Sequence, residues 1–113
     1  MIHVIKDRKD FLRAAKSRYS KASAGAIIQI YNRNDLMPVR VGFTATTKIG
    51  NAVIRNKTKR RLRAAIRFII GQQSKYCGID LVIIGRQNTA SMPWNQLVVD
   101  LSKTLDALHA RIR

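Results

Sequence analysis

The chain has 113 residues, 46% of them hydrophobic, and a formal net charge of +16 at pH 7. This length predicts one domain, spanning residues 1–113, that can bury a hydrophobic core without disulfide bonds or a structural metal. So large a positive charge repels itself and argues against a protein that acts without an anionic partner. Nucleic acid is the first partner we expect, because phosphate contacts release counterions, and an anionic membrane surface is the alternative.

The rest of the composition narrows the class. Cys77 is the only cysteine, which excludes an internal disulfide, and we expect it to be a buried thiol in a reducing compartment. His3 and His109 lie far apart in the sequence with no cluster of Cys or carboxylates near them, so no protein-held metal is expected. No segment approaches the roughly 20 apolar residues of a membrane span. We therefore expect a cytoplasmic protein that does not bind a membrane.

The first half of the chain predicts one helix and two strands. Asp7 can cap a helix over residues 8–18, and the small polar residues 20–25 are expected to form a loop. Two β-rich segments follow, at residues 26–31 and 39–46. Because they are close in sequence, we expect them to form an antiparallel hairpin.

The next stretch is strongly cationic: seven of the thirteen residues from Arg55 to Arg67 are Lys or Arg, and none is acidic. Apolar residues recur through it at steps of three and four, which predicts a helix that begins after Gly50 and ends at Gly71. Its buried stripe is expected to contain Ile54, Thr58, Leu62, Ala65, Ile66 and Ile69. The side chains expected to point away from that stripe are Asn56, Lys57, Arg60, Arg63 and Arg67. A helix that packs on one side and is cationic on the other suits a phosphate backbone.

The last third predicts a strand and a helix. Residues 79–85 are a nearly continuous apolar run, which is typical of a strand covered on both faces. A final helix follows, with Ser91 as its cap and Trp94 as an anchor in the core. The order α-β-β-α-β-α predicts an α+β fold, an α-β sandwich in which a small, mostly antiparallel sheet packs with helices.

No catalytic residues are predicted. The six Asp are scattered, and neither His has a partner nearby in the sequence. The loop at residues 48–51 lacks the glycine spacing of a nucleotide-binding P-loop. We therefore expect this chain to bind nucleic acid without cleaving it unaided.

Residues 55–63, preceded by 48–53, resemble the signature of the protein subunit of bacterial ribonuclease P: Arg-Asn-Arg, any residue, Lys/Arg-Arg, any two residues and Arg. The resemblance extends to residues 10–11, 40–44 and 80–84, and so covers nearly the whole chain. It implies a fold similar to the second domain of ribosomal protein S5, with a β-α-β crossover around the basic helix.

The resemblance also implies a function. In this family a large RNA catalyses cleavage with Mg²⁺, and the small protein binds that RNA and the 5′ leader of precursor tRNA to assist 5′-end maturation. The chain would be a subunit of an endoribonuclease holoenzyme, would hold no cofactor itself, and is expected to be a monomer when free of RNA. The helix positions implied to contact RNA are Arg55, Asn56, Lys57, Lys59, Arg60 and Arg63, and we expect Arg67, on the same outward side of the helix, to contact it as well. The positions implied for a leader cleft are Phe11, Ile27, Gln29, Thr44 and Lys48.

Three positions depart from the family pattern. Lys57 stands where many members have Arg, which keeps the charge but loses the bidentate geometry. Ala15 and Gln29 stand where some members have Phe and Tyr, which removes aromatic surface from the leader cleft. We expect charge and hydrogen bonding to hold the leader here, with Tyr31, on the same strand face as Gln29, partly replacing the lost ring. The alternatives are another basic RNA-binding protein, such as a ribosomal protein, and a DNA-binding module with the basic helix in the major groove.

Overall fold

The computed structural model describes residues 2–71 and 75–112. The predicted elements are present in the predicted order, together with short strands near the N-terminus. The elements are β1 (His3–Val4), α1 (Arg8–Lys16), β2 (Tyr19–Ala22), β3 (Ala26–Asn32), β4 (Arg40–Thr44), the 3-10 helix η1 (Thr47–Ile49), α2 (Ala52–Gly71), β5 (Ile79–Gly85) and α3 (Trp94–Ile112).

The described strands form one mixed sheet in the order β1-β4-β5-β3-β2. The middle strand, β5, pairs antiparallel with β3 and parallel with β4. The predicted hairpin of residues 26–31 with residues 39–46 is therefore wrong, because β5 lies between the two strands. The antiparallel ladders contain more residue pairs than the parallel ones, as expected. The parallel pairing of β4 with β5, on either side of α2 in the sequence, confirms the β-α-β crossover.

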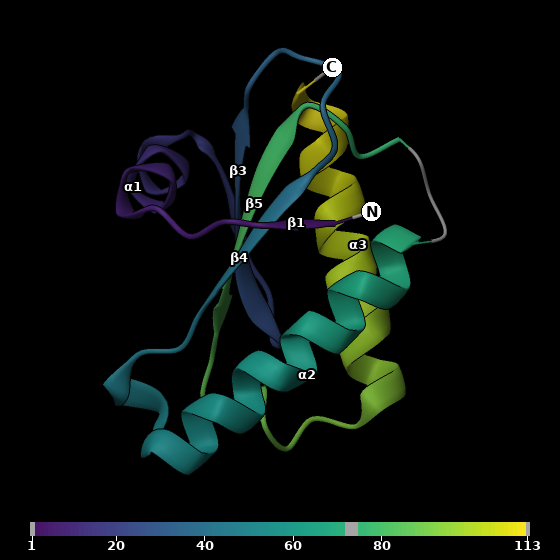
Figure 1. Ribbon diagram of the computed structural model, residues 1–113. Coiled ribbons are helices and arrows are strands. Elements are labelled where there is room, and N and C mark those ends of the chain that lie inside the picture. Colours follow the sequence, from purple (N-terminus) through teal and green to yellow (C-terminus); the bar gives the residue numbers. More distant parts are fainter. Residues whose placement is uncertain (1, 72–74, 113) are drawn as a thin grey trace.

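The sheet separates two layers of helices: α1 covers one face, and α2 and α3 cover the other (Figure 1). We call these the α1 face and the α2 face. Leu81 and Ile83 of β5 belong to the larger core, on the α2 face. Ile5, Ala14 and Val82 form a smaller core under α1. Because β5 is covered on both faces, nearly all of its side chains are buried, as its apolar run predicts.

The basic helix has close to its predicted bounds and its predicted buried side. Its buried residues are Thr58, Leu62, Ala65, Ile66, Ile69 and Ile70. Ile54, at the exposed start of the predicted stripe, is 38% exposed. A Cβ on Gly85 of β5 would lie 2.4 Å from Cγ2 of Thr58, so the glycine is what lets α2 approach the sheet closely.

Several local expectations are wrong. Residues 20–25 were expected to form a loop, but part of this segment lies in the edge strand β2, whose side chains are largely exposed and so give no apolar pattern. Trp94 is 42% exposed rather than anchored in the core. Cys77 is exposed rather than buried. Ser91 lies in a turn before α3, where its Oγ donates to the Asn88 carbonyl, and does not cap the helix.

Replacing Leu62 with Ala is expected to destabilise the fold by about 2–5 kcal/mol, because the side chain is fully buried and its removal leaves a cavity. The measurement is denaturant unfolding followed by circular dichroism. The control is Leu36→Ala, the same change at a side chain that is 91% exposed, which should leave the midpoint unchanged. Equal midpoints for the two variants would mean that α2 presents a different side to the sheet.

Candidate nucleic-acid interface

The turn before α2 fixes where the helix begins. Gly50 has a φ of 148°, and a Cβ there would lie 2.9 Å from the side chain of Ile54, so glycine is required. Asn51 Oδ1 accepts the N–H of Ile54 at 3.0 Å and caps the helix. Arg55 Nη1 donates to the Gly50 carbonyl at 3.0 Å. Lys48 lies in η1 directly before this turn, so the turn connects it tightly to α2.

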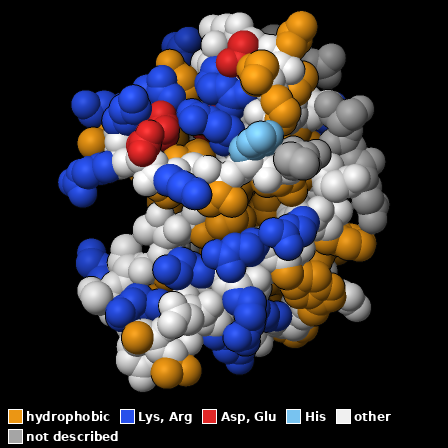
Figure 2. Space-filling model, in the orientation of Figure 1, with side chains coloured by type: hydrophobic (Ala, Val, Ile, Leu, Met, Phe, Trp, Pro, Cys, Tyr) orange, Lys and Arg blue, Asp and Glu red, His pale blue; other side chains and the backbone are white. Residues whose placement is uncertain are grey.

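Four of the predicted RNA-contacting residues lie in one line along the exposed side of α2. Asn56, Arg60, Arg63 and Arg67 recur at steps of four, three and four, and all are exposed. At 1.5 Å per residue this line is about 16 Å long. Figure 2 shows a row of Lys and Arg side chains crossing the molecule over α2. We call these four residues the α2 stripe.

The other cations of α2 differ in their surroundings. Lys57 is exposed and Lys59 is half-buried. Arg61 instead donates to the carbonyl oxygens of Thr89 and Met92, at 2.5 Å each, and so fastens the loop between β5 and α3. Arg61 was not among the predicted RNA contacts, and these bonds give it a structural role.

Among the described residues, the cations of α2 form no ion pair with a carboxylate. Within residues 2–71 and 75–112, every ion pair involves Arg13, Arg33, Arg40 or Lys75, and none of these lies on α2. The positive charge of the helix is therefore not neutralised within the described part of the protein, and it can attract an external anion.

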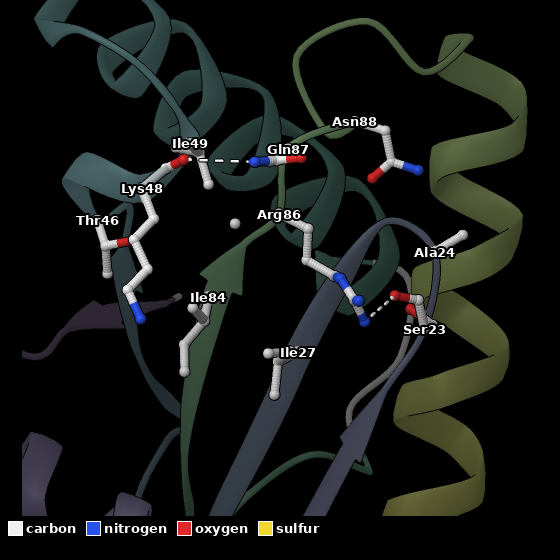
Figure 3. A pocket seen from close by; sticks show the side chains of 11 residues that line it. Ser23, Ala24, Ile27, Thr46, Lys48, Ile49, Ile84, Arg86, Gln87 and Asn88 are labelled. Atoms are coloured by element: carbon white, nitrogen blue, oxygen red, sulfur yellow. Dashed lines mark hydrogen bonds between the residues drawn. The ribbon is translucent and has the colours of Figure 1, made fainter.

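A cavity of about 650 Å³ opens on the α1 face of the sheet. Ile27 of β3 and Ile84 of β5, which are partners in the ladder, form its apolar floor. Lys48 and Arg86 lie on its sides, with their charges next to that floor (Figure 3). The polar side chains that complete the lining are Ser23, Thr46, Gln87 and Asn88. An apolar floor between two cations suits a flexible anionic chain with planar apolar groups.

One wall of this cavity is fastened to α3 by a series of hydrogen bonds. Asp100 accepts from Ser23 Oγ at 2.6 Å and from the Gly25 N–H at 2.9 Å. Thr89 Oγ1 donates to the Gly25 carbonyl at 2.7 Å and accepts the N–H of Arg86 at 2.8 Å. Arg86 Nη1 then donates to the Ser23 carbonyl at 3.1 Å. The loop that carries Arg86 is therefore held in one place.

The structure places the predicted leader-cleft residues at increasing distance from this cavity. Ile27 and Lys48 line it. Thr44 is adjacent, since its partner in the β4–β5 ladder is Ile84 of the floor. Gln29 lies two residues further along β3, toward the part of the sheet that α1 covers. Ile27, Gln29 and Thr44 therefore lie on the same face of the sheet, and Lys48 lies beside them in η1.

Phe11 and Tyr31 belong to the packing of α1 rather than to the cavity lining. A Cβ on Gly42 would lie 2.6 Å from the Phe11 ring, so that ring lies directly on the glycine. The guanidinium of Arg13 lies 4.6 Å from the centroid of the Tyr31 ring. Both rings are partly buried against the smaller core. Only part of each ring is left exposed to a nucleobase.

Of the residues that line the cavity, the sequence interpretation named Ile27 and Lys48 and missed the rest, including the consecutive polar residues Arg86, Gln87 and Asn88. These three residues lie between the predicted strand at residues 79–85 and the predicted final helix, and no role was predicted for them. The available signal was their position, because polar side chains that directly follow a buried strand are held at a sheet edge, where binding residues often lie.

A buried charge network joins α1 to the sheet. Asp80 of β5 has a fully buried side chain and accepts hydrogen bonds from Arg33 at 2.5 Å and from Arg40 at 2.6 and 2.8 Å. Asp10, in the first turn of α1, accepts from Arg13 at 2.6 Å and lies 3.5 Å from Arg40. Arg13 also lies 3.6 Å from Asp80. These five side chains are called the Asp80 network.

The network shifts the pKa of its arginines. Hydrogen bonds to Asp80 raise the pKa of Arg40 above its ordinary value. Burial acts to lower the pKa of Arg33, but hydrogen bonds to Asp35 and Asp80 outweigh it, and the net shift is upward. The Arg33 guanidinium in turn lowers the pKa of the Asp35 carboxyl. Both arginines therefore stay charged at every pH at which the protein is expected to be folded.

Candidate metal sites and membrane-spanning helices are both absent from the described part of the chain. None of its groups of three or more His, Cys, Asp or Glu is placed to hold a metal ion. None of its helices is long and apolar enough to cross a membrane. The groups that line the cavity on the α1 face are therefore cations, amides and hydroxyls around an apolar floor.

Comparison with known proteins gives one consistent result. The family model described as Ribonuclease P matches residues 2–109. The chain is 44% identical, over 103 residues, to the "Ribonuclease P protein component" of Gluconacetobacter diazotrophicus, covering 91% of this chain and 88% of the relative. It is 43% identical over 112 residues to that of Ruegeria pomeroyi, covering 96% and 88%. The solved RNase P protein of Staphylococcus aureus is 30% identical, with a TM-score of 0.77 over 93% of this chain and 94% of that one.

The chain belongs to the ribonuclease P protein family. The described residues form a five-stranded mixed sheet with three α-helices, which matches the solved RNase P protein, so the predicted fold class is confirmed. It is the protein component of ribonuclease P, a subunit of an endoribonuclease holoenzyme, and it assists the 5′ maturation of tRNA. Ribonuclease P RNA is its partner.

Replacing Asp80 with Asn is expected to destabilise the protein by about 3–5 kcal/mol, because Arg33 and Arg40 would lose the buried charge that faces them. Denaturant unfolding measures the change. The control is Asp7→Asn, which alters the net charge equally at an exposed residue whose side chain makes no capping bond, and which should unfold like the wild type. If both variants unfold alike, the Asp80 network does not hold the fold together.

Proposed function

We propose that this chain binds the catalytic RNA of ribonuclease P through the α2 stripe and the single-stranded 5′ leader of precursor tRNA through the cavity on the α1 face. One observation carries the proposal: within the described residues, the cations of α2 have no acidic partner. A folded protein of this charge is destabilised by its own repulsion, and bound RNA relieves that repulsion.

The α2 stripe suits RNA backbone better than base edges. Arg60, Arg63 and Arg67 follow each other along one side of a straight helix, at a spacing that lets each meet a phosphate along a strand. Arg55, Lys57 and Lys59 lie beside this line and add to the field around it. The binding that follows is driven by counterion release and is strongly dependent on salt.

The cavity suits a single strand rather than a duplex. Ile27 and Ile84 offer an apolar floor for unstacked bases, and Lys48 and Arg86 offer charges to the phosphates on either side. Thr44 and Gln29 lie next to this floor on the same face of the sheet. The described lining contains no aromatic ring, so charge and hydrogen bonding are the main attraction for the leader, with Phe11 and Tyr31 contributing only their exposed edges.

Catalysis is assigned to the RNA subunit with its Mg²⁺. This chain contributes by lowering the repulsion between two polyanions and by holding the leader in a fixed orientation. Both effects stabilise the assembled complex at low Mg²⁺, where the RNA alone assembles poorly with its substrate.

The test is 5′-leader cleavage at low Mg²⁺ by a bacterial ribonuclease P RNA, with and without this protein, and with the protein alone. Strong stimulation of the RNA, with no cleavage by the protein alone, is expected. Lys48→Ala should weaken binding of precursor tRNA to the holoenzyme about tenfold, the effect of one charge-assisted hydrogen bond, and leave mature tRNA unaffected. An equal loss for both RNAs would place Lys48 outside the leader site, and cleavage by the protein alone would overturn the assignment of catalysis.

Arg60→Ala is expected to weaken binding to ribonuclease P RNA and to lower the slope of log affinity against log salt by about one unit, because one phosphate contact is lost. The control is Lys103→Ala, which removes one exposed charge from α3 instead. Filter binding at four or more salt concentrations measures both slopes. An unchanged slope for Arg60→Ala would mean that this side chain does not contact a phosphate.

A further inference from the structure

A second hollow lies on the α2 face, where the edge of the sheet meets α2. It has a volume of about 70 Å³ and is lined by Ile2, Val4, Phe43, Arg63, Ile66 and Arg67. We call it the Phe43 hollow. Phe43 and Thr44 are successive residues of β4 and point to opposite faces, so the sheet separates this hollow from the cavity on the α1 face.

The hollow combines an apolar interior with a cationic rim. Ile66 is buried beneath it, and Val4, at its edge, is 55% exposed. Phe43 is only partly buried, and the guanidinium carbon of Arg63 lies 5.6 Å from the centroid of its ring. Arg67 follows one turn later on the same side of α2. In Figure 2, hydrophobic side chains are visible between the cations over α2 and those nearer α1.

The chemistry of the hollow selects its occupant. An aliphatic side chain of a protein partner would use the apolar interior but would cover two guanidinium groups without neutralising them, which is costly. A nucleotide fits both parts of the hollow, because its base can stack on Phe43 and Arg63 and its phosphate can pair with Arg67. The hollow is also continuous with the α2 stripe, because Arg63 and Arg67 belong to both.

We propose that the Phe43 hollow receives one unpaired nucleobase of the RNA that lies along α2. The base packs against Phe43 beside the Arg63 guanidinium, and its phosphate pairs with Arg67. The inference rests on the proposed binding of ribonuclease P RNA to α2, and it adds a contact that depends on an unstacked base at one point of that RNA.

The test compares Phe43→Leu with the wild type for binding to ribonuclease P RNA and for protection of unpaired bases from dimethyl sulfate. Leu keeps the apolar interior but removes the ring. We expect about tenfold weaker binding with an unchanged salt slope, since stacking releases no counterions, and the loss of protection at one base even with saturating protein. Arg67→Ala should instead lower the slope by about one unit.

Two further variants separate this effect from a loss of folding. Phe68→Leu makes the same change at a ring on α2 that is 53% exposed and does not line the hollow, and it should bind like the wild type. Arg63→Lys keeps the charge but removes the planar guanidinium, and it should expose the same base to dimethyl sulfate with the salt slope unchanged. Thermal unfolding of each variant checks that the fold persists.

The possible results separate the two proposals. Full affinity and full protection in both Phe43→Leu and Arg63→Lys would overturn the nucleobase site while leaving RNA binding by α2 intact. Equal losses in Phe43→Leu and Phe68→Leu would overturn it as well, because the effect would not be specific to the hollow. Altered self-association without altered RNA binding would assign the hollow to a protein contact. Failure of the wild type to bind ribonuclease P RNA would overturn both proposals.

Discussion

Burial of the Asp80 carboxylate is the constraint on which the arrangement around the sheet depends. A carboxylate in the middle of a sheet is strongly unfavourable unless cations and hydrogen-bond donors surround it. Arg33 brings the segment after β3 to it, and Arg40 brings β4 to it. Arg13 then attaches α1 to the same carboxylate, and Asp10 attaches α1 to Arg40. This network fixes where α1 lies, and therefore which part of the α1 face stays open as a cavity.

Most of the protein's few negative charges lie in contacts within the fold. Asp100 holds the loop that carries Ser23, and Asp106 accepts hydrogen bonds from Tyr76 and Lys75. With Asp10, Asp35 and Asp80 in contact with arginines, five of the six Asp have partners within the described residues. The acidic groups are therefore used for internal structure, and the cations, including those of α2, determine the field at the surface. A protein built this way is selective for polyanions by its charge distribution as well as by its net charge.

The elements that sequence predicts best are those whose packing is periodic. The bounds and buried side of α2 and the limits of β5 follow directly from apolar spacing, because each element must bury a defined side. Strand order does not follow from apolar spacing. The short sequence distance between β3 and β4 favoured a hairpin, but β5 lies between these two strands and pairs with both of them. The cavity was predictable only in part: Ile27 and Lys48 came from the family resemblance, while Arg86 is placed by its bond to the Ser23 carbonyl and by the bonds that Asp100 and Thr89 make to Gly25. Such bonds join residues 60 or more positions apart and leave no local pattern.

The two proposed RNA surfaces lie on opposite faces of the sheet, yet they are mechanically connected. Lys48 leads through Gly50 directly into α2, and its carbonyl accepts a hydrogen bond from Gln87 on the far side of the cavity. Thr58 packs α2 against Gly85, which also lines the cavity. A shift of α2 over the sheet would therefore move the cavity wall with it. Because an RNA held on α2 would be oriented relative to this rigid unit, the proposed leader site would be oriented relative to the same RNA, and binding alone would then determine where the substrate lies.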